Sequence, residues 1–498
     1  IATERSEIGL MKAFGFRHLE IGWYYARMVM AITVVGIVIG WVVGAWFGQV
    51  STELYAEFYR FPLLIFSPPP STFAIGALVS LGAALAGTLG SMRRAANLPP
   101  AEAMRPPAPP LYRRTGLSAS TVAAWLDQPT RIILRQIVRW PGRALLTSAG
   151  IGLSVGVLVM SLQWIDSINH IVQVYFYDTQ RQDMMVGLVE PQSATAIYEF
   201  AHLPGVLMVE PMRIVSAYLR HGNRSHRGAL TGVPPDAKLQ RVYDASGYVA
   251  PLPPGGVVMG TKLAEKLGVS TGDMLQVDVL EGRRPQLTVP VVGLIETYIG
   301  VPAFMDITML NRLLKERPSI EYANLLVDQA ERPALYAELK ALPEISSVML
   351  REAAVSTFHE TLAQTLLIYI SFFAIFACAL GFGVVYNSTR IALSERGREL
   401  ATLRVLGFSR AEVSYILLGE VTLLILVGLP LGCLAGQGLA WLMTSAFETE
   451  LYRVPLVIEL STYGIAVLVA LTATALSAAL VRRRLDRLDL VAVLKTRE

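Results

Sequence analysis

Charged residues are scarce in this 498-residue chain: they make up 16% of it, while 53% of its residues are hydrophobic. The mean hydropathy of +0.47 is too high for an ordinary soluble protein of this length. The composition therefore excludes a soluble globular protein and indicates an integral membrane protein.

Cysteine is nearly absent as well, since the chain has two, Cys378 and Cys433, each inside an apolar run. Such positions argue against a disulfide framework or a cysteine metal site, so both are interpreted as small core hydrophobes. The formal net charge of +4 is small, and the arginines stand in short blocks beside apolar runs. That pattern is typical of membrane topology and predicts no nucleic-acid partner.

Motifs for catalysis are missing too. The nearest approach to the phosphate-binding loop G-x-x-x-x-G-K-[ST] is GGVVMGTK at 255–262, where Thr precedes Lys. His221 and His226 could form a metal pair, but without an acidic or Cys partner nearby a solvated basic loop is favoured. No Ser, His, Asp arrangement can be argued from spacing. We therefore expect no enzymatic activity, no metal site and no cofactor in this chain.

Long uncharged runs are what the chain does contain. Six of them are long enough to cross a bilayer, which takes about 20 helical residues. They lie within 28–52, 61–92, 144–165, 361–389, 421–447 and 460–481. Gly-rich stretches such as GLPLGCLAGQG permit close helix contact in lipid, so the prediction is a bundle of six transmembrane helices. Glu420, near the start of the fifth run, is interpreted as an interfacial acid rather than a functional one.

The distribution of arginine predicts the orientation. Basic residues crowd the segment 93–143 and the C-terminal tail, which places both in the cytoplasm, whereas the loops after the first and fifth runs carry mostly acids. Both ends of the chain are then cytoplasmic, and 166–360 is extracytoplasmic. This segment alternates strand-like runs such as LTVPVVGLIE with helix-like runs such as ALYAELKALP, which predicts an α/β domain. An amphipathic helix at 126–143 is expected to lie along the membrane surface.

The chain contains an internal repeat. TERSEIGLMKAFGF at 3–16 aligns with SERGRELATLRVLGF at 394–408, with one residue inserted after the shared Glu-Arg. Each copy is followed by two apolar runs and a basic exit, AEAMR at 101–105 and VAVLK at 491–495. Each copy is predicted to form a short amphipathic cytoplasmic helix with a Gly-Phe turn into the next crossing. By the same logic the first half is incomplete, and a further helix and outside domain are expected before Ile1.

These motifs, together with LGVSTGD at 267–273 after GTKLAEK, resemble the FtsX/MacB-type permeases of ABC transporters, the mechanotransmission or type VII class. The resemblance implies that each repeated segment is a coupling helix docked on a separate ATPase. The implied contact residues are Glu4, Arg5, Glu7, Gly9 and Gly15 in the first copy, and Glu395, Arg396, Glu399, Arg404 and Gly407 in the second.

The resulting fold class is a membrane protein with an α-helical transmembrane bundle and an inserted extracytoplasmic, MacB-like α/β domain. The predicted segments are a coupling segment 1–25, a transmembrane pair 26–92, a cytoplasmic linker and interfacial helix 93–142, a transmembrane helix 143–165, the outside domain 166–360, a transmembrane helix 361–389, a second coupling helix 390–412, a transmembrane pair 413–484 and a cytoplasmic tail 485–498.

The resemblance implies a permease subunit of the bacterial inner membrane. Its expected partners are two ABC ATPase subunits that bind ATP and Mg²⁺, membrane lipid, and a periplasmic adaptor or hydrolase. Its expected role is export or extraction of a lipophilic or peptide-like substrate. A non-transporting regulator of an extracytoplasmic hydrolase is the alternative. An ion-coupled secondary transporter would need acids at the bilayer midplane, and the sequence offers almost none.

Overall fold

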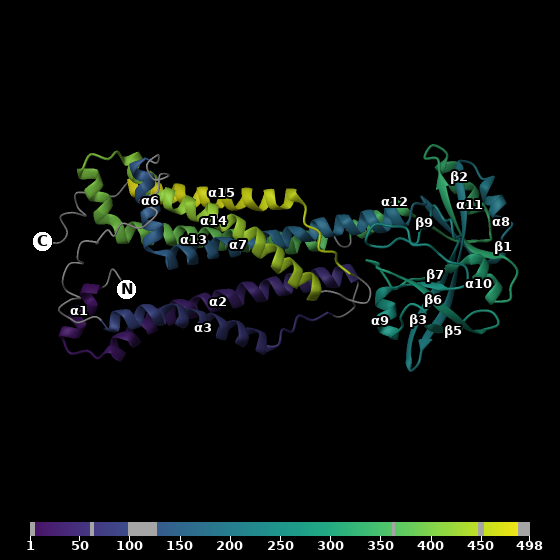
Figure 1. Ribbon diagram of the computed structural model, residues 1–498, viewed down its shortest axis with the longest axis horizontal. Coiled ribbons are helices and arrows are strands. Elements are labelled where there is room, and N and C mark those ends of the chain that lie inside the picture. Colours follow the sequence, from purple (N-terminus) through teal and green to yellow (C-terminus); the bar gives the residue numbers. More distant parts are fainter. Residues whose placement is uncertain (1–4, 60–63, 98–126, 361–363, 447–452, 487–498) are drawn as a thin grey trace. The chain divides into compact units, whose positions relative to one another are not determined.

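The computed structural model describes residues 5–59, 64–97, 127–360, 364–446 and 453–486, and the path of the chain can be followed in Figure 1. Six helices are long and apolar enough to cross a membrane, which confirms the predicted helical bundle with its inserted domain. They belong to α2 (His18–Tyr59), α3 (Pro70–Asn97), α7 (Pro141–Val172), α13 (Gln364–Val405), α14 (Arg410–Ala446) and α15 (Leu460–Asp486).

The first two membrane helices form a hairpin. The Trp41 indole N–H of α2 donates to the Phe73 carbonyl of α3 at 3.2 Å, and the two rings meet edge to face. Within the uncharged run 61–92 the helix α3 begins only at Pro70, because residues 64–69 have no regular structure. Consecutive prolines explain the late start, since proline is accepted in the first turn of a helix and disrupts its interior.

The predicted interfacial helix is α6 (Gln128–Arg139), which lies against α14. Ile133 is 2% exposed, and a Cβ atom added at Gly419 would come within 2.6 Å of its Cδ1 atom. The hydroxyls of Thr130 and Tyr415 are 3.3 Å apart at the same contact. The apolar stripe of α6 is therefore buried at Ile133 by contact with α14.

Helices α7 and α14 approach each other through small residues. Gly428, Gly432 and Gly436 of α14 recur every fourth position and face the backbone of α7. The Ser148 hydroxyl donates to the Leu424 carbonyl at 3.0 Å beside the first of these glycines. Close backbone approach of this kind is how helices associate in lipid, where apolar burial supplies little driving force.

The extracytoplasmic domain contains nine strands in the order β3-β7-β4-β6-β5-β2-β8-β1-β9, with β3 also paired to β2. Their bounds are Met184–Ser193 (β1), Val206–His221 (β2), Arg224–Val233 (β3), Val257–Gly260 (β4), Met274–Val279 (β5), Gln286–Ile295 (β6), Ala303–Asp306 (β7), Ser319–Val327 (β8) and Ile345–Leu350 (β9). The extra pairing closes the first six strands of this order into a ring, and the others continue as an open antiparallel sheet.

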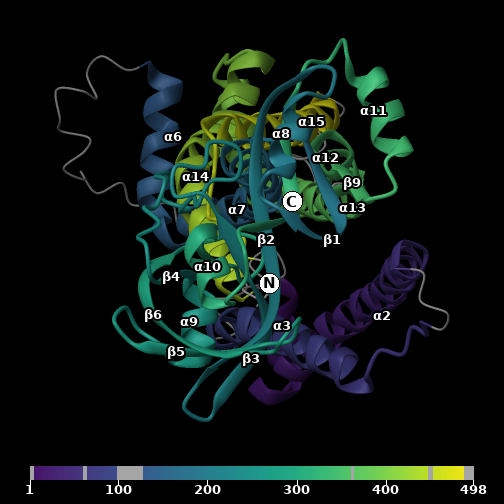
Figure 2. The same ribbon diagram turned by 90° about the vertical axis from the view of Figure 1, so that its right-hand side faces the viewer.

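The long strand β2 belongs to both parts, as Figure 2 shows in the view onto this domain. Its first half pairs with β8 and its second half with β3 and β5. The ring encloses one apolar core, covered by α9 (Thr261–Leu267) and α10 (Ile307–Leu313). The open sheet buries a second core under α8 (Ala196–Ala201) and α11 (Arg332–Ala341).

Helix α7 does not stop at Ile165 as expected but continues to Val172 and then as a π-helical turn, η2 (Gln173–Thr179). Ile168, Val172 and Phe176 pack there against α12 (Arg351–Phe358), the helix that leads back toward the membrane. The end of α7, η2 and α12 thus form a packed helical unit, the stalk.

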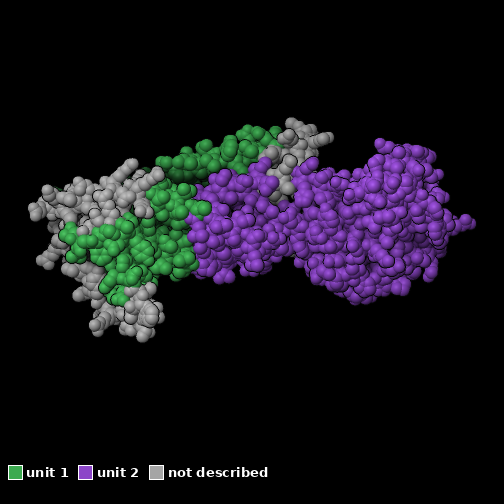
Figure 3. Space-filling view, turned by 90° about the horizontal axis from the view of Figure 1, so that it is seen from above, with its two compact units in different colours: residues 1–151, 380–428, 472–498 green, residues 152–379, 429–471 purple. Residues whose placement is uncertain are grey.

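Two compact units divide the chain, residues 1–151, 380–428 and 472–498 in one and 152–379 and 429–471 in the other (Figure 3). The divisions fall inside α7, α13, α14 and α15, so these four helices run from one unit into the other.

Candidate functional site

The first repeated segment is the helix α1 (Arg5–Ala13) and the turn that follows it. Gly15 has φ +89°, the left-handed conformation that favours glycine. The Phe16 N–H donates to the Met11 carbonyl at 3.2 Å, and the Phe14 N–H donates to the Leu10 carbonyl at 3.0 Å. A bond that spans five residues around a left-handed glycine is the Schellman way of ending a helix.

The second repeated segment ends in the same way, after the last turn of α13. Gly407 has φ +100°. The Phe408 N–H donates to the Leu403 carbonyl at 3.0 Å, and the Leu406 N–H donates to the Thr402 carbonyl at 2.9 Å. Each of these residues lies 392 positions after its counterpart in the first copy, so the sequence repeat is also a repeat of backbone geometry.

Both turns lead into the next helix through a cap that the sequence analysis missed. The Arg17 N–H donates to the Glu20 carboxylate at 2.8 Å, and the Ser409 N–H donates to the Glu412 carboxylate at 2.7 Å. In the second copy the Ser409 hydroxyl oxygen also accepts a hydrogen bond from the Glu412 N–H at 3.2 Å. Ser-x-x-Glu is a capping box, and this signal could have marked the start of α14 in the sequence.

An apolar contact fixes each turn to the helix after it. Met11 packs on Ile21 and Tyr25 in the first copy. The equivalent residues Leu403, Val413 and Leu417 form a cluster in the second, joined by Phe408. Because a helix end, a left-handed turn, a cap and an apolar cluster recur together, each repeated segment is held at a defined angle to the membrane helix that follows.

The predicted contact residues lie in these two segments. Glu4 falls outside the described residues, as do the matching exits AEAMR and VAVLK. Arg5, Glu7 and Gly9 belong to α1, while Glu395, Arg396, Glu399 and Arg404 belong to the last part of α13. Gly15 and Gly407 occupy the turns.

The second segment differs from the expected short helix because it is the end of α13, a single helix of 42 residues from Gln364 to Val405. Between 390 and 405 the sequence has one glycine and no proline, so nothing ends the helix before Gly407. At a rise of about 1.5 Å per residue the helix is about 63 Å long, roughly twice the hydrocarbon thickness of a bilayer. The coupling segment and the membrane-spanning segment of α13 are therefore parts of one continuous helix.

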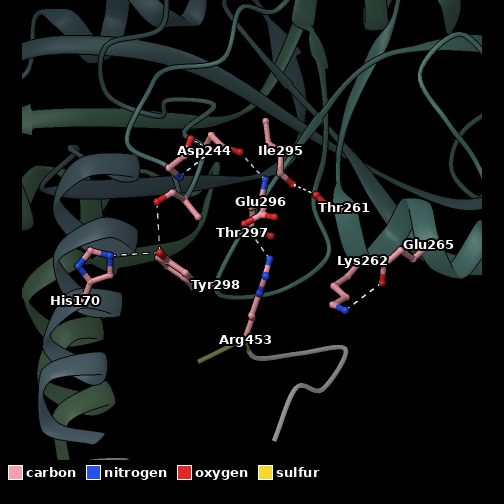
Figure 4. Close-up of polar contacts among 12 residues, drawn as sticks. His170, Asp244, Thr261, Lys262, Glu265, Ile295, Glu296, Thr297, Tyr298 and Arg453 are labelled. Atoms are coloured by element: carbon pink, nitrogen blue, oxygen red, sulfur yellow. Dashed lines mark hydrogen bonds and ion pairs between the residues drawn. The ribbon is translucent and has the colours of Figure 1, made fainter. Parts of the chain in front are cut away.

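A second group of polar contacts, the outer junction, joins the bundle to the extracytoplasmic domain (Figure 4). Its members are His170, Asp244, Glu296, Tyr298 and Arg453. Arg453, in the segment before α15, binds the Glu296 carboxylate at 3.0 Å and donates its backbone N–H to the Tyr298 carbonyl at 2.9 Å. The Tyr298 hydroxyl lies 3.3 Å from Nε2 of His170 on α7.

Two groups of the outer junction, Tyr298 and Asp244, have shifted pKa values. Burial raises the pKa of the Tyr298 hydroxyl, and the nearby positive charge of Arg453 only partly opposes this, so the phenol stays neutral. Burial alone would raise the pKa of Asp244 as well. Hydrogen bonds from Ser246 and from the Glu296 N–H outweigh burial and hold that pKa below its ordinary value. Sequence analysis gave no hint of this group, because its members are up to 283 residues apart.

Asp166 of α7 caps the start of α15 from a different helix. Its carboxylate accepts from the Glu459 N–H at 2.9 Å and from the Thr462 hydroxyl at 2.7 Å, and the residue is 7% exposed. A carboxylate at a helix N-terminus satisfies backbone N–H groups that have no partner within the helix.

Replacing Asp166 with leucine, which has a similar shape, should lower the stability of the protein by about 2 kcal/mol, because two buried donors lose their acceptor. For a chain of 498 residues that loss corresponds to a fall of roughly 2 °C in the unfolding midpoint. Asp166→Asn keeps one acceptor oxygen and should lose less. Thermal unfolding in detergent should give the highest midpoint for the unaltered protein, a lower one for Asp166→Asn and the lowest for Asp166→Leu. Equal midpoints for these three proteins would contradict the capping role.

Three other sequence features have defined places. In GGVVMGTK, Val257–Gly260 form the strand β4 and α9 starts directly at Thr261, so the backbone does not form a phosphate-cradling loop. His221 ends β2, and His226 pairs with Leu219 in the hairpin with β3. Within the described residues, no group of three or more His, Cys, Asp or Glu is placed to hold a metal ion.

Comparisons with known proteins match nearly all of the chain. Residues 1–100 and 371–490 match the family model for the FtsX-like permease C-terminal region, and residues 144–342 match that for the MacB-like periplasmic core domain. An uncharacterized ABC transporter permease protein of Mycobacterium tuberculosis is 23% identical over 224 residues. That match covers 42% of this chain and 25% of the relative, so this chain spans only about a quarter of that protein.

Two solved structures match part of the chain. The periplasmic region of MacB from Actinobacillus actinomycetemcomitans has 11% identity and a TM-score of 0.27, covering 38% of this chain and 97% of that one. The extracellular domain of the noncanonic ABC-type transporter YknZ from Gram-positive bacteria has 14% identity and a TM-score of 0.24, covering 34% of this chain and 100% of that one. Six membrane helices, a repeated helix-turn segment and the two family matches lead to one conclusion: the chain belongs to the FtsX/MacB-like family of ABC transporter permeases.

Proposed function

We propose that this chain is the membrane subunit through which separate ATPase subunits move the extracytoplasmic domain. The observation that carries this proposal is the recurrence of one helix-turn-cap unit, with Gly15 and Gly407 in the same left-handed conformation, at two positions 392 residues apart. Two equivalent contacts of one chain are what a symmetric pair of partner subunits would require. The two ATPase subunits would bind ATP and Mg²⁺ themselves.

The path of the movement follows from the helices. A force applied to the last part of α13 would travel along this helix to its start at Gln364, close in sequence to α12 of the stalk. Within the stalk, α12 packs on η2. In the outer junction, Tyr298 of the loop that follows β6 contacts His170 of α7. The proposed work is export or extraction of a lipophilic or peptide-like substrate across or from the bacterial inner membrane. Both ends of this chain would then lie in the cytoplasm, and lipid and a periplasmic adaptor or hydrolase would be further partners.

Charge reversal at both segments tests the proposed coupling. Glu7→Lys combined with Glu399→Lys should reduce stimulation of the partner ATPase by tenfold or more, because loss of a charged contact at an interface typically costs about 2–5 kcal/mol. The measurement is ATP hydrolysis by the reconstituted complex with and without the permease chain.

The matched control reverses the same number of charges on the other side of the membrane. Glu190→Lys with Glu338→Lys alters two exposed carboxylates of the extracytoplasmic domain and should leave ATPase stimulation unchanged. Normal stimulation by the Glu7/Glu399 double variant would refute the assignment of the two segments as coupling sites. Normal stimulation without any transport by the unaltered complex would favour regulation of an extracytoplasmic hydrolase instead.

A further inference from the structure

Helix α6 carries a basic face on the side turned away from α14. Its buried side is marked by Ile133, which packs at Gly419 of α14. Arg135 and Arg139 are one helical turn apart, and at about 100° per residue they lie about 160° and about 120° around the helix axis from Ile133. Both arginines are exposed. Their guanidinium groups are therefore available to a ligand beside the helix.

These two positive charges are not neutralised by a carboxylate. Within the described part of the chain neither arginine forms an ion pair, and Arg139 contacts the face of the Trp140 ring, 5.9 Å from its centroid. The sequence has no Asp or Glu from 128 to 165. Asp127 precedes α6 and lies about two turns before Arg135. Two adjacent cations without a counter-ion are complementary to an anion.

The position of α6 indicates which anion this is. Only Trp140 separates Arg139 from Pro141, where the membrane-spanning helix α7 begins. Figures 1 and 2 both show α6 lying across the direction of the membrane helices. Leu145 and Leu146 follow in α7 and are 70% and 74% exposed, as expected for side chains that face acyl chains. An exposed tryptophan directly before such a run is typical of the membrane interface. The basic face therefore lies at the level of the lipid headgroups.

We propose that Arg135 and Arg139 bind the phosphate group of an anionic phospholipid in the leaflet around this end of α7, which is the cytoplasmic leaflet in the proposed topology. A guanidinium group matches two phosphate oxygens, and arginines one turn apart reach the same phosphate. A zwitterionic phospholipid has this phosphate too, but its ammonium group would be repelled by the two arginines. The site is thus selective for lipids with a net negative charge. It goes beyond the proposed coupling function, since it needs neither ATP nor the partner subunits.

The test uses photo-crosslinking of the full chain in phosphatidylcholine nanodiscs that contain a small fraction of a lipid probe. The two probes, a phosphatidylglycerol and a phosphatidylcholine, have the same acyl chains with a diazirine at the same carbon. Each basic residue near an anionic surface strengthens binding about fivefold. Residues 132–146 should therefore be labelled roughly 25-fold more by the phosphatidylglycerol probe. Arg135→Gln should lower this ratio to about five, and Arg135→Gln combined with Arg139→Gln should lower it to about one.

The matched control removes the same charge elsewhere. Arg312→Gln with Arg317→Gln alters two exposed arginines of the extracytoplasmic domain and should leave the labelling ratio of residues 132–146 unchanged. Arginine and glutamine have similar helix propensities, so the Arg135/Arg139 double variant should unfold at the same temperature as the unaltered protein. Arg135→Lys with Arg139→Lys keeps both charges and should retain most of the preference for the anionic probe.

Three results would overturn the lipid site. The first is equal labelling of residues 132–146 by the two probes in the unaltered protein. The second is a preference for the anionic probe that persists in the Arg135→Gln, Arg139→Gln double variant. The third is loss of this labelling when the partner ATPase is added, which would assign the basic face of α6 to a protein contact. Because the first two are measured on the permease chain alone, they are independent of whether the coupling proposal holds.

Discussion

Replacing Gly407 with valine should abolish most of the stimulation of the partner ATPase. A Cβ atom at this position would meet no atom within 4 Å, so crowding plays no part. The effect comes from the backbone, because φ +100° is strongly unfavourable for a β-branched residue. Non-glycine residues held in such conformations cost about 1–3 kcal/mol. A cost of about 2 kcal/mol lowers the equilibrium constant for forming the native turn roughly thirtyfold, which favours other conformations that do not present the contacts of the segment at the required angle.

A graded series separates the turn from other effects of mutation. Gly407→Asn should retain part of the stimulation, since asparagine tolerates the left-handed region better than other residues. Gly15→Val should reproduce the loss in the first copy, where φ is +89° and the space is equally open. The control is Gly383→Val in the helical part of α13, also in open space, which should stimulate normally. Comparable stimulation by Gly407→Val and Gly383→Val would mean that this turn does not position the coupling segment.

The sequence was sufficient to predict the membrane helices and the repeat, because both depend on local patterns. An uncharged run of twenty residues has few alternatives to a helix in lipid, and Gly-Phe after an amphipathic stretch is a local signal for a helix end. The predicted boundaries differ from the structure where nothing in the sequence ends a helix. The absence of a terminator after Thr389 lets α13 run on to Val405.

Contacts between distant residues could not be predicted. Strand β2 pairs with β3, β5 and β8, and nothing in its sequence specifies that one strand joins a closed ring to an open sheet. The outer junction depends on the tertiary fold in the same way, since His170 and Tyr298 meet only because the fold brings them together.

Adding a single methyl group at Gly432 should destabilise the bundle severely. A Cβ atom there would lie 2.6 Å from the Val155 Cβ atom and 2.8 Å from the Gly152 carbonyl oxygen, so the backbones of α14 and α7 would have to separate. Overpacking of this kind typically costs about 1–3 kcal/mol. Separation of the two helices would also weaken the neighbouring contacts at Gly428 and Gly436, where a Cβ atom would come within 3.0 Å and 2.7 Å of α7.

Gly438 provides the matched control six residues further along α14, because a Cβ atom there meets nothing within 4 Å. Both Gly→Ala changes gain the same helix propensity, about 1 kcal/mol, so the difference between the variants isolates packing. We expect Gly438→Ala to be neutral or stabilised, and Gly432→Ala to unfold about 1–3 °C below it in detergent. Gly436→Ala should resemble Gly432→Ala. If Gly432→Ala, Gly436→Ala and Gly438→Ala unfold at the same temperature, α7 and α14 do not pack through these glycines. A different helix contact would then support the stalk.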